Sequence, residues 1–173
     1  MINAPNLITL FRFVLVPLFV AVFFAGHIKA AFWILVLAGV TDVLDGYVAR
    51  SRGLITEIGS MLDPLADKTM MIAVIVSLLI TGMIPWTAAA AIFIRDAGMI
   101  AGSAFFHFRG KKTVPANVMG KLTTILFYLA ILFIVYETGF AIAYLWFVIG
   151  FSFVTSTIYI VKFKSLNKKV MQK

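Results

Sequence analysis

Long apolar stretches separated by short polar connections dominate this chain. Six of them are each about 20 residues long, enough to cross a bilayer as a helix of about 30 Å. Pro64 favours a helix start near Leu62, and Ser51–Ser60 is expected to form a connection. The expected spans are about Leu7–Ala25, Ala31–Arg50, Leu62–Ile80, Thr87–Phe108, Asn117–Tyr136 and Phe140–Phe163.

Composition assigns these stretches to a membrane rather than to a soluble core. Hydrophobic residues make up 62% of the 173 residues and charged residues 13%, and the mean hydropathy is +1.06. Such values lie outside the range of soluble globular domains. The connections are too short to hold a soluble domain, so residues 1–173 are predicted to form one all-α integral membrane domain. Cysteine is absent, which excludes disulfides and a thiol nucleophile.

The positive charge predicts an orientation and excludes one class of partner. The net charge is +8, but no polar basic domain exists to bind nucleic acid. Basic residues gather in the second and fourth connections and in a lysine-rich tail, Lys162–Lys173, whereas the first connection has only Lys29. Both termini are therefore expected on the cytoplasmic side of the cell membrane, near anionic lipids. A cleavable signal peptide is not expected, because residues 1–5 carry no basic side chain.

Four aspartates form the most unusual feature of the sequence. A carboxylate within the hydrocarbon region costs about 2.5–3.5 kcal/mol on insertion scales, so a cluster of acids requires a function. Asp42 and Asp45 are three residues apart, and Asp63 and Asp67 are four apart, so each pair shares a helix face. Both pairs are expected at the cytoplasmic edge of antiparallel helices. Facing carboxylates need a cation, and oxygen ligands favour Mg²⁺, Mn²⁺ or Ca²⁺.

Small and basic residues surround the acids. Gly46, Ala49 and Gly59 lack bulk, which lets a large ligand approach; helix packing in the membrane is the alternative. Arg50 has the position of a phosphate partner or of a cytoplasmic anchor. Arg12, one turn inside the first span, either extends to lipid headgroups or reaches into a polar site.

Written out, the stretch is Asp42-x-x-Asp45-Gly46-x-x-Ala49-Arg50, then Gly59, Asp63 and Asp67 at fixed spacing. This pattern matches the signature of the CDP-alcohol phosphotransferase family of integral membrane enzymes. The resemblance implies six transmembrane helices, a homodimer, and a cytoplasm-facing site with two divalent ions, Mg²⁺ or Mn²⁺. It implies metal ligation by Asp42, Asp45 and Asp63, with Asp67 as general base and a further contact to metal. It implies CDP binding by Asp42, Gly46, Ala49, Arg50 and Gly59.

The implied reaction is transfer of a phosphatidyl group from CDP-diacylglycerol. Two metal ions held by the aspartates would polarise the pyrophosphate and offset charge on the CMP leaving group. An acceptor hydroxyl attacks in line, and Asp67 takes its proton. No covalent enzyme intermediate is needed. A divalent metal transporter is the alternative outside enzymes, although the later helices lack acids leading to the other face.

Further resemblances outside the motif favour glycerol 3-phosphate as the acceptor. Residues 5–12 and 62–68 resemble bacterial phosphatidylglycerophosphate synthases, which use glycerol 3-phosphate. Such an acceptor requires cations, and the candidates are Arg95, Arg109, Lys111, Lys112 and Lys121. Those synthases usually have Arg-Glu where this chain has Arg95-Asp96, and Arg-Asp also resembles cardiolipin synthases, whose acceptor is phosphatidylglycerol. Inositol phosphate and serine remain open as acceptors, and an ion pair with an aspartate on another helix remains open for Arg95.

Overall fold

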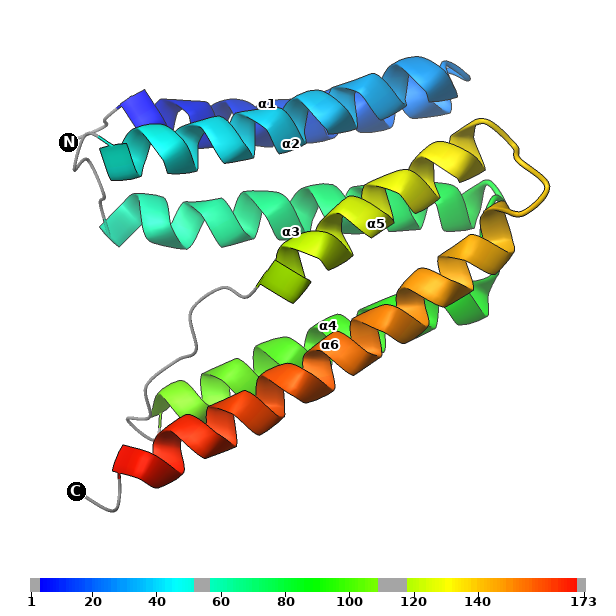
Figure 1. The fold of residues 1–173 in the computed structure, drawn as a ribbon. Coiled ribbons are helices and arrows are strands. Elements are labelled where there is room, and N and C mark those ends of the chain that lie inside the picture. Colours follow the sequence, from blue (N-terminus) through cyan, green and yellow to red (C-terminus); the bar gives the residue numbers. More distant parts are fainter. Residues whose placement is uncertain (1–3, 52–56, 109–117, 171–173) are drawn as a thin grey trace. The chain divides into compact units, whose positions relative to one another are not determined.

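The computed structural model describes residues 4–51, 57–108 and 118–170, and these residues form six helices (Figure 1). Within the described ranges there is no strand, as the sequence predicts. The helices are α1 (Ala4–Phe24), α2 (Ile28–Ser51), α3 (Glu57–Ile80), α4 (Trp86–Phe108), α5 (Val118–Val135) and α6 (Ala141–Val170).

The helices divide into two compact units of three. The first unit, Met1–Met83, contains α1 to α3, and the second, Ile84–Lys173, contains α4 to α6. In the first unit α1 packs against both α2 and α3, which contact each other less extensively. In the second unit α6 packs against both α4 and α5. One helix in each unit is therefore the common neighbour of the other two.

Residues three and four apart form a buried stripe on each helix of the first unit. This spacing puts side chains on one helix face, where they pack against the neighbouring helix. The stripes are mostly apolar, but on α1 the stripe includes Thr9 and Arg12, which are 1% and 3% exposed. The other members are Leu15, Phe19 and Phe23 on α1, Ala31, Leu35 and Ala38 on α2, and Ala66, Met70, Val74 and Leu78 on α3.

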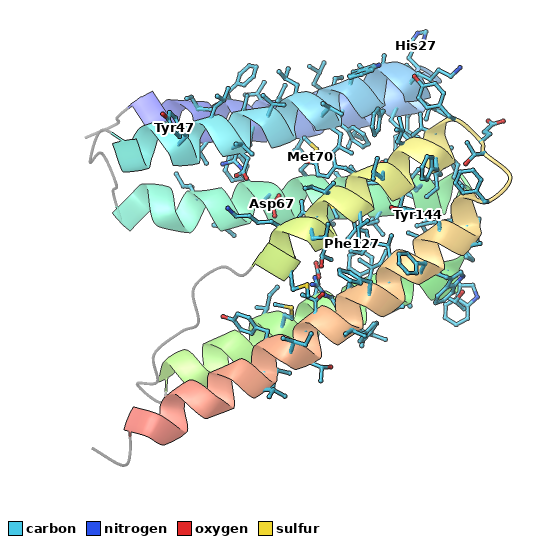
Figure 2. All side chains as sticks on the ribbon, in the orientation of Figure 1. His27, Tyr47, Asp67, Met70, Phe127 and Tyr144 are labelled. Atoms are coloured by element: carbon cyan, nitrogen blue, oxygen red, sulfur yellow. The ribbon has the colours of Figure 1, made fainter. Side chains whose placement is uncertain are left out.

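The second unit has an apolar half and a polar half. Its apolar half contains the buried residues Ala88, Ile92, Phe127, Ile131, Ile134, Leu145 and Val148. Edge-on aromatic contacts extend it, with the rings of Phe133 and Tyr144 centred 5.0 Å apart, and Figure 2 labels Phe127 and Tyr144. Along α6 the buried stripe then changes to hydroxyl side chains at Ser152 and Thr155. The polar half lies toward the end of the unit where α4 ends and α5 begins.

Three helices end with the same backbone turn. Gly26, Gly82 and Glu137 follow α1, α3 and α5 with positive φ angles of 87°, 71° and 51°. The next residue donates its N–H five residues back in each case, for example from Met83 to the carbonyl of Leu78 at 2.9 Å. This closing turn caps helix carbonyls and favours glycine. Glu137 is the departure, because a side chain at positive φ is sterically disfavoured.

The helix boundaries correct three expectations. The third helix begins at Glu57, so Pro64 lies within it rather than at its start. The predicted connection, Ser51–Ser60, is helical at Ser51 and from Glu57 onward. The sixth helix extends to Val170, so much of the lysine-rich tail continues the helix. Helix propagation explains both extensions, because lysine and glutamate are good helix formers once a helix has begun.

Membrane-spanning character is clearest in α6. Within the described residues, Ala141–Val161 is the one helical stretch both long and apolar enough to cross a membrane. Ile8–Phe24 and Met119–Val135 are apolar but shorter. Each of the six helices nevertheless carries a large apolar side chain that is more than half exposed. Examples are Val14, Val43, Ile80, Ile94, Ile125 and Val161.

Candidate functional site

The aspartate motif occupies facing ends of two antiparallel helices. Asp42 and Asp45 lie nine and six residues before the end of α2, and Asp63 and Asp67 lie six and ten residues after the start of α3. At 1.5 Å per residue, Asp45 and Asp63 are both about 9 Å from these helix ends, and Asp42 and Asp67 about 14–15 Å. The two helices run in opposite directions with these ends together (Figure 1). The motif acids thus lie at matched levels along the two helices.

Asp42 is held by an arginine of α1. The Arg12 guanidinium donates through Nη1 to Asp42 Oδ1, forming an ion pair between α1 and α2. The arginine side chain is 3% exposed, whereas that of Asp42 is 44% exposed. Asp42 continues the stripe of Leu35 and Ala38 that faces α1. Of the two alternatives for Arg12, the structure therefore supports the one in which it reaches a polar site.

Asp67 has a different environment from Asp42. It follows the buried Ala66, and its side chain is exposed, whereas Met70, three residues further on, is buried. Figure 2 labels both Asp67 and Met70 on α3. Consecutive residues of a helix are rotated by about 100° around its axis. Asp67, the residue after Ala66, therefore lies beside the buried stripe of α3. An exposed carboxylate is accessible to a substrate, as a general base requires.

For most of the other motif residues the structure describes only which helix they belong to. Asp45, Ala49 and Arg50 belong to α2, and Gly59 and Asp63 belong to α3, but their side chains lie outside the described set. Gly46 is on α2 and half-buried. Among the side chains that the structure describes, no three His, Asp or Glu residues gather into a metal-binding group. Only two of the four motif aspartates belong to that set.

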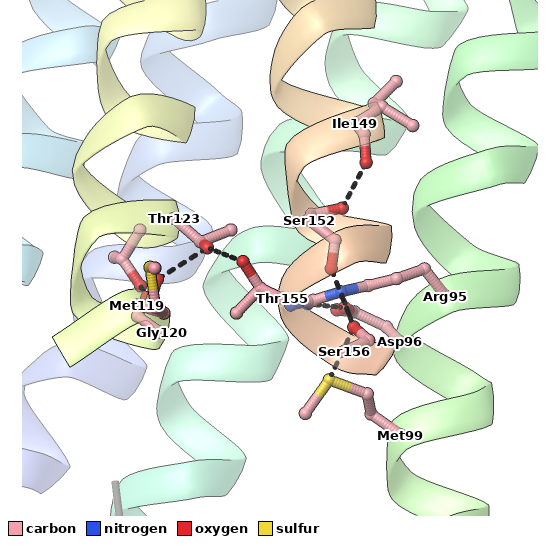
Figure 3. Close-up of polar contacts among 11 residues, drawn as sticks. Arg95, Asp96, Met99, Met119, Gly120, Thr123, Ile149, Ser152, Thr155 and Ser156 are labelled. Atoms are coloured by element: carbon pink, nitrogen blue, oxygen red, sulfur yellow. Dashed lines mark hydrogen bonds and ion pairs between the residues drawn. The ribbon is translucent and has the colours of Figure 1, made fainter. Parts of the chain in front are cut away.

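Arg95 is the centre of a polar cluster in the second unit. Its Nε donates to Ser156 Oγ of α6 at 3.2 Å, and its Nη1 donates to Asp96 Oδ1 at 2.7 Å (Figure 3). The Arg95 and Asp96 side chains are 15% and 20% exposed. The described ion pair of Arg95 is therefore formed with the adjacent residue on α4. The expected alternative, an ion pair with another helix, is absent among the described contacts of Arg95.

Hydroxyl groups of α6 contact both neighbouring helices. Ser156 accepts from Arg95 of α4, and Thr155 Oγ1 accepts from Thr123 of α5 at 3.4 Å (Figure 3). Ser156 donates to the carbonyl of Ser152 at 2.8 Å, and Met99 Sδ lies 3.2 Å from the same hydroxyl. The motif and the charge pattern did not predict these hydroxyl contacts. The available signal was Ser152, Thr155 and Ser156 at helical spacing within an otherwise apolar span.

Of the remaining acceptor candidates, the structure describes Lys121, which lies outside the polar cluster of Arg95. Lys121 is exposed and precedes Thr123 by two positions on α5. Two positions correspond to about 200° around a helix, so Lys121 lies on the side of α5 away from α6. Arg109, Lys111 and Lys112 lie outside the described residues. Within the described second unit, Arg95 is thus the basic side chain that the fold encloses with polar partners.

A family model matches most of the chain. The model of the CDP-alcohol phosphatidyltransferase family matches residues 2–156. The chain belongs to this family. The resemblance predicted from the aspartate motif is therefore confirmed, and the match covers the helices of both units up to Ser156 of α6.

Relatives of this phosphatidyltransferase-family chain have names of more than one kind. A probable phosphatidylglycerophosphate synthase of Mycobacterium tuberculosis is 38% identical over 70% of this chain and 60% of its own length. A CDP-diacylglycerol–glycerol-3-phosphate 3-phosphatidyltransferase of Rickettsia felis is 32% identical over 72% of this chain and 70% of its own. A Schizosaccharomyces pombe fusion protein named for CMP-forming cardiolipin synthase and a hydrolase is 36% identical over 65% of this chain and 18% of its own. The match thus spans less than two thirds of the mycobacterial relative.

Proposed function

We propose that this chain transfers a phosphatidyl group from CDP-diacylglycerol to glycerol 3-phosphate, releasing CMP and forming phosphatidylglycerophosphate. The observation that carries the proposal is the complete aspartate motif at matched levels on α2 and α3 of a family member. One bacterial relative described above is named for phosphatidylglycerophosphate synthesis and another for transfer involving glycerol 3-phosphate, and both names support glycerol 3-phosphate as acceptor.

The residues fit a divalent metal site. Four carboxylates on two antiparallel helices supply the hard oxygen ligands that Mg²⁺ and Mn²⁺ prefer. Asp42 keeps an exposed side although Arg12 holds Oδ1, and a carboxylate has lone pairs for both partners. Asp42, Asp45, Asp63 and Asp67 would hold two ions, which would stabilise charge on the pyrophosphate during transfer.

The protein's own groups then have defined tasks. Gly46, Ala49, Arg50 and Gly59 bind the CDP portion together with Asp42. Asp67 accepts the proton of the acceptor hydroxyl, whose oxygen attacks the phosphorus of the phosphatidyl group. The bond from that phosphorus to the CMP oxygen breaks, and CMP leaves with the electron pair. Atoms and charge balance without a covalent enzyme intermediate.

Arg95 is the proposed partner of the acceptor phosphate. It is mostly enclosed, and Ser156 and Asp96 hold two of its nitrogens. These contacts use two of the five N–H donors of the guanidinium, and a phosphate oxygen would take another. Arg109, Lys111, Lys112 and Lys121 add positive charge at the same side of the membrane in the proposed topology.

In that topology all six helices cross the cell membrane, with both termini and the active site on the cytoplasmic side. The exposed apolar side chains on every helix support lipid contact. The positions of the basic residues support the orientation. A homodimer, which the family resemblance implies, stays a prediction.

The decisive experiment measures CMP release by the purified protein. CDP-diacylglycerol and Mg²⁺ or Mn²⁺ are supplied with glycerol 3-phosphate, phosphatidylglycerol, inositol phosphate or serine in parallel. We expect release with glycerol 3-phosphate that is lost on chelation. Release with phosphatidylglycerol alone would instead assign cardiolipin synthesis, which the Arg95-Asp96 pair and the fungal relative favour as the second candidate. No CMP with any acceptor would reject the enzyme and leave the transporter alternative.

A further inference from the structure

The ion pair between Arg12 and Asp42 links the aspartate motif to a helix outside it. Arg12 lies eight residues after the start of α1, and Asp42 lies nine residues before the end of α2. These offsets put them at about 12 Å and 14 Å from the same end of two antiparallel helices. The two residues also lie on the faces through which α1 and α2 pack. The way in which α1 and α2 are aligned along each other therefore brings Arg12 and Asp42 together.

The two partners differ in their access to solvent. Arg12 is 3% exposed and approaches the carboxylate from the buried side, whereas 44% of the Asp42 side chain remains exposed. The arginine binds Oδ1 through Nη1. A ligand reaching Asp42 from the open side would therefore meet a carboxylate whose orientation is already restrained.

We infer that Arg12 is a positioning residue for the metal site, an inference that rests on the proposed role of Asp42 as metal ligand. Its guanidinium restrains the Asp42 carboxylate from the buried side. The carboxylate is then already oriented when a metal ion binds. Partners of metal ligands act in this way, and losing one typically lowers metal affinity about 10–100-fold. Arginine suits the task because its planar fork fixes direction as well as charge.

Two other roles for Arg12 make different predictions. If it only joined α1 to α2, its replacement would lower the stability of the metal-free protein but would not change the metal concentration that gives half of the stabilisation. If it were a built-in substitute for the metal, its removal would make metal bind more tightly. The direction of the change in metal affinity therefore separates the three roles.

The experiment follows thermal unfolding of the full chain in detergent while Mn²⁺ alone is added. The proteins are wild type, Arg12→Lys, Arg12→Met and Arg95→Met. The last is a matched control, because it removes an enclosed, ion-paired arginine from the second unit. We expect the half-saturating Mn²⁺ concentration to rise about 10–100-fold in Arg12→Met, to rise less in Arg12→Lys, and to stay at the wild-type value in Arg95→Met.

The outcomes distinguish this inference from the proposed function. An unchanged or lower half-saturating concentration in both Arg12 variants, with wild type responding to Mn²⁺ and releasing CMP, would overturn only the role of Arg12. If Arg12→Met does not fold, Arg12→Lys decides alone, since it keeps the buried charge but loses the fork. A wild-type protein that neither responds to Mn²⁺ nor releases CMP would reject the metal site and this inference with it.

Discussion

Arg12 and Asp42 form an ion pair across α1 and α2 in which the arginine is buried and the carboxylate is partly open. The aspartate motif lies on α2 and α3, but its first acid, Asp42, is held by Arg12 of α1. The candidate site therefore involves all three helices of the first unit.

Replacing Asp67 by asparagine should separate binding from chemistry. Asparagine has nearly the same shape as aspartate but is not a base. The variant therefore lacks the group that accepts the proton of the acceptor hydroxyl. We expect CMP release to fall by about 10²–10⁴-fold, with CDP-diacylglycerol and Mn²⁺ still bound. Glu137→Gln, at the exposed turn after α5, serves as the control and should behave as wild type. Full turnover in Asp67→Asn would remove Asp67 as the base.

Removing a metal ligand should change the metal dependence itself. In Asp42→Ala and in Asp63→Ala the ion loses an oxygen ligand, so more metal is needed to drive CMP release. We expect the half-activating Mn²⁺ concentration to rise at least about tenfold, a scale typical of metal-site changes. Asp42→Ala should also lower the Tm without metal, since it leaves Arg12 buried without this counter-charge. A titration identical to wild type would contradict the ligand assignment.

The polar cluster around Arg95 should affect the binding of the acceptor, glycerol 3-phosphate, rather than the binding of CDP-diacylglycerol. Losing a charge-assisted hydrogen bond to phosphate costs about 1.5–3 kcal/mol, so Arg95→Met should raise the KM for glycerol 3-phosphate by about 10–100-fold. Ser156→Ala should raise it only several-fold, because Asp96 still holds Nη1. The KM for CDP-diacylglycerol should not move in either variant.

Ser152→Ala provides the control for that measurement. Its hydroxyl lies one turn earlier on α6 and donates to the carbonyl of Ile149 at 2.7 Å, without a described contact to Arg95. Its acceptor KM should match that of wild type. A rise in the nucleotide-lipid KM in Arg95→Met, with the acceptor KM unchanged, would assign Arg95 to the other substrate.

The closing turns predict a stabilising substitution. Glu137 adopts φ 51°, where glycine occurs at the equivalent turns after α1 and α3. A left-handed conformation costs a side-chain-bearing residue about 1–2 kcal/mol, partly offset by the greater freedom of unfolded glycine. Glu137→Gly should therefore raise the Tm in detergent, and Gly82→Ala, which introduces the strain, should lower it. A lower Tm in Glu137→Gly would show that the glutamate side chain stabilises the turn.

Much of the architecture follows from local pattern. Six apolar stretches gave six helices, and most of their ends agree within a few residues because turn glycines such as Gly26 and Gly82 stop helices locally. The start of α3 and the end of α6 were misplaced. There the polar residues suggested a connection and a tail, but a helix continues through them when a long apolar segment already supports it.

The sequence by itself predicted two carboxylate pairs, because acids three and four residues apart on a helix share a face whatever surrounds them. The resemblance of the written-out motif to a known signature predicted the family, which the family match then confirmed. Tertiary structure alone decided which partners these residues meet. Arg12 is 30 positions from Asp42 and Arg95 is 61 from Ser156, and no local pattern relates such positions. Their meeting depends on how α1 packs on α2 and α4 on α6, which is set by the register of whole buried stripes rather than by any short sequence.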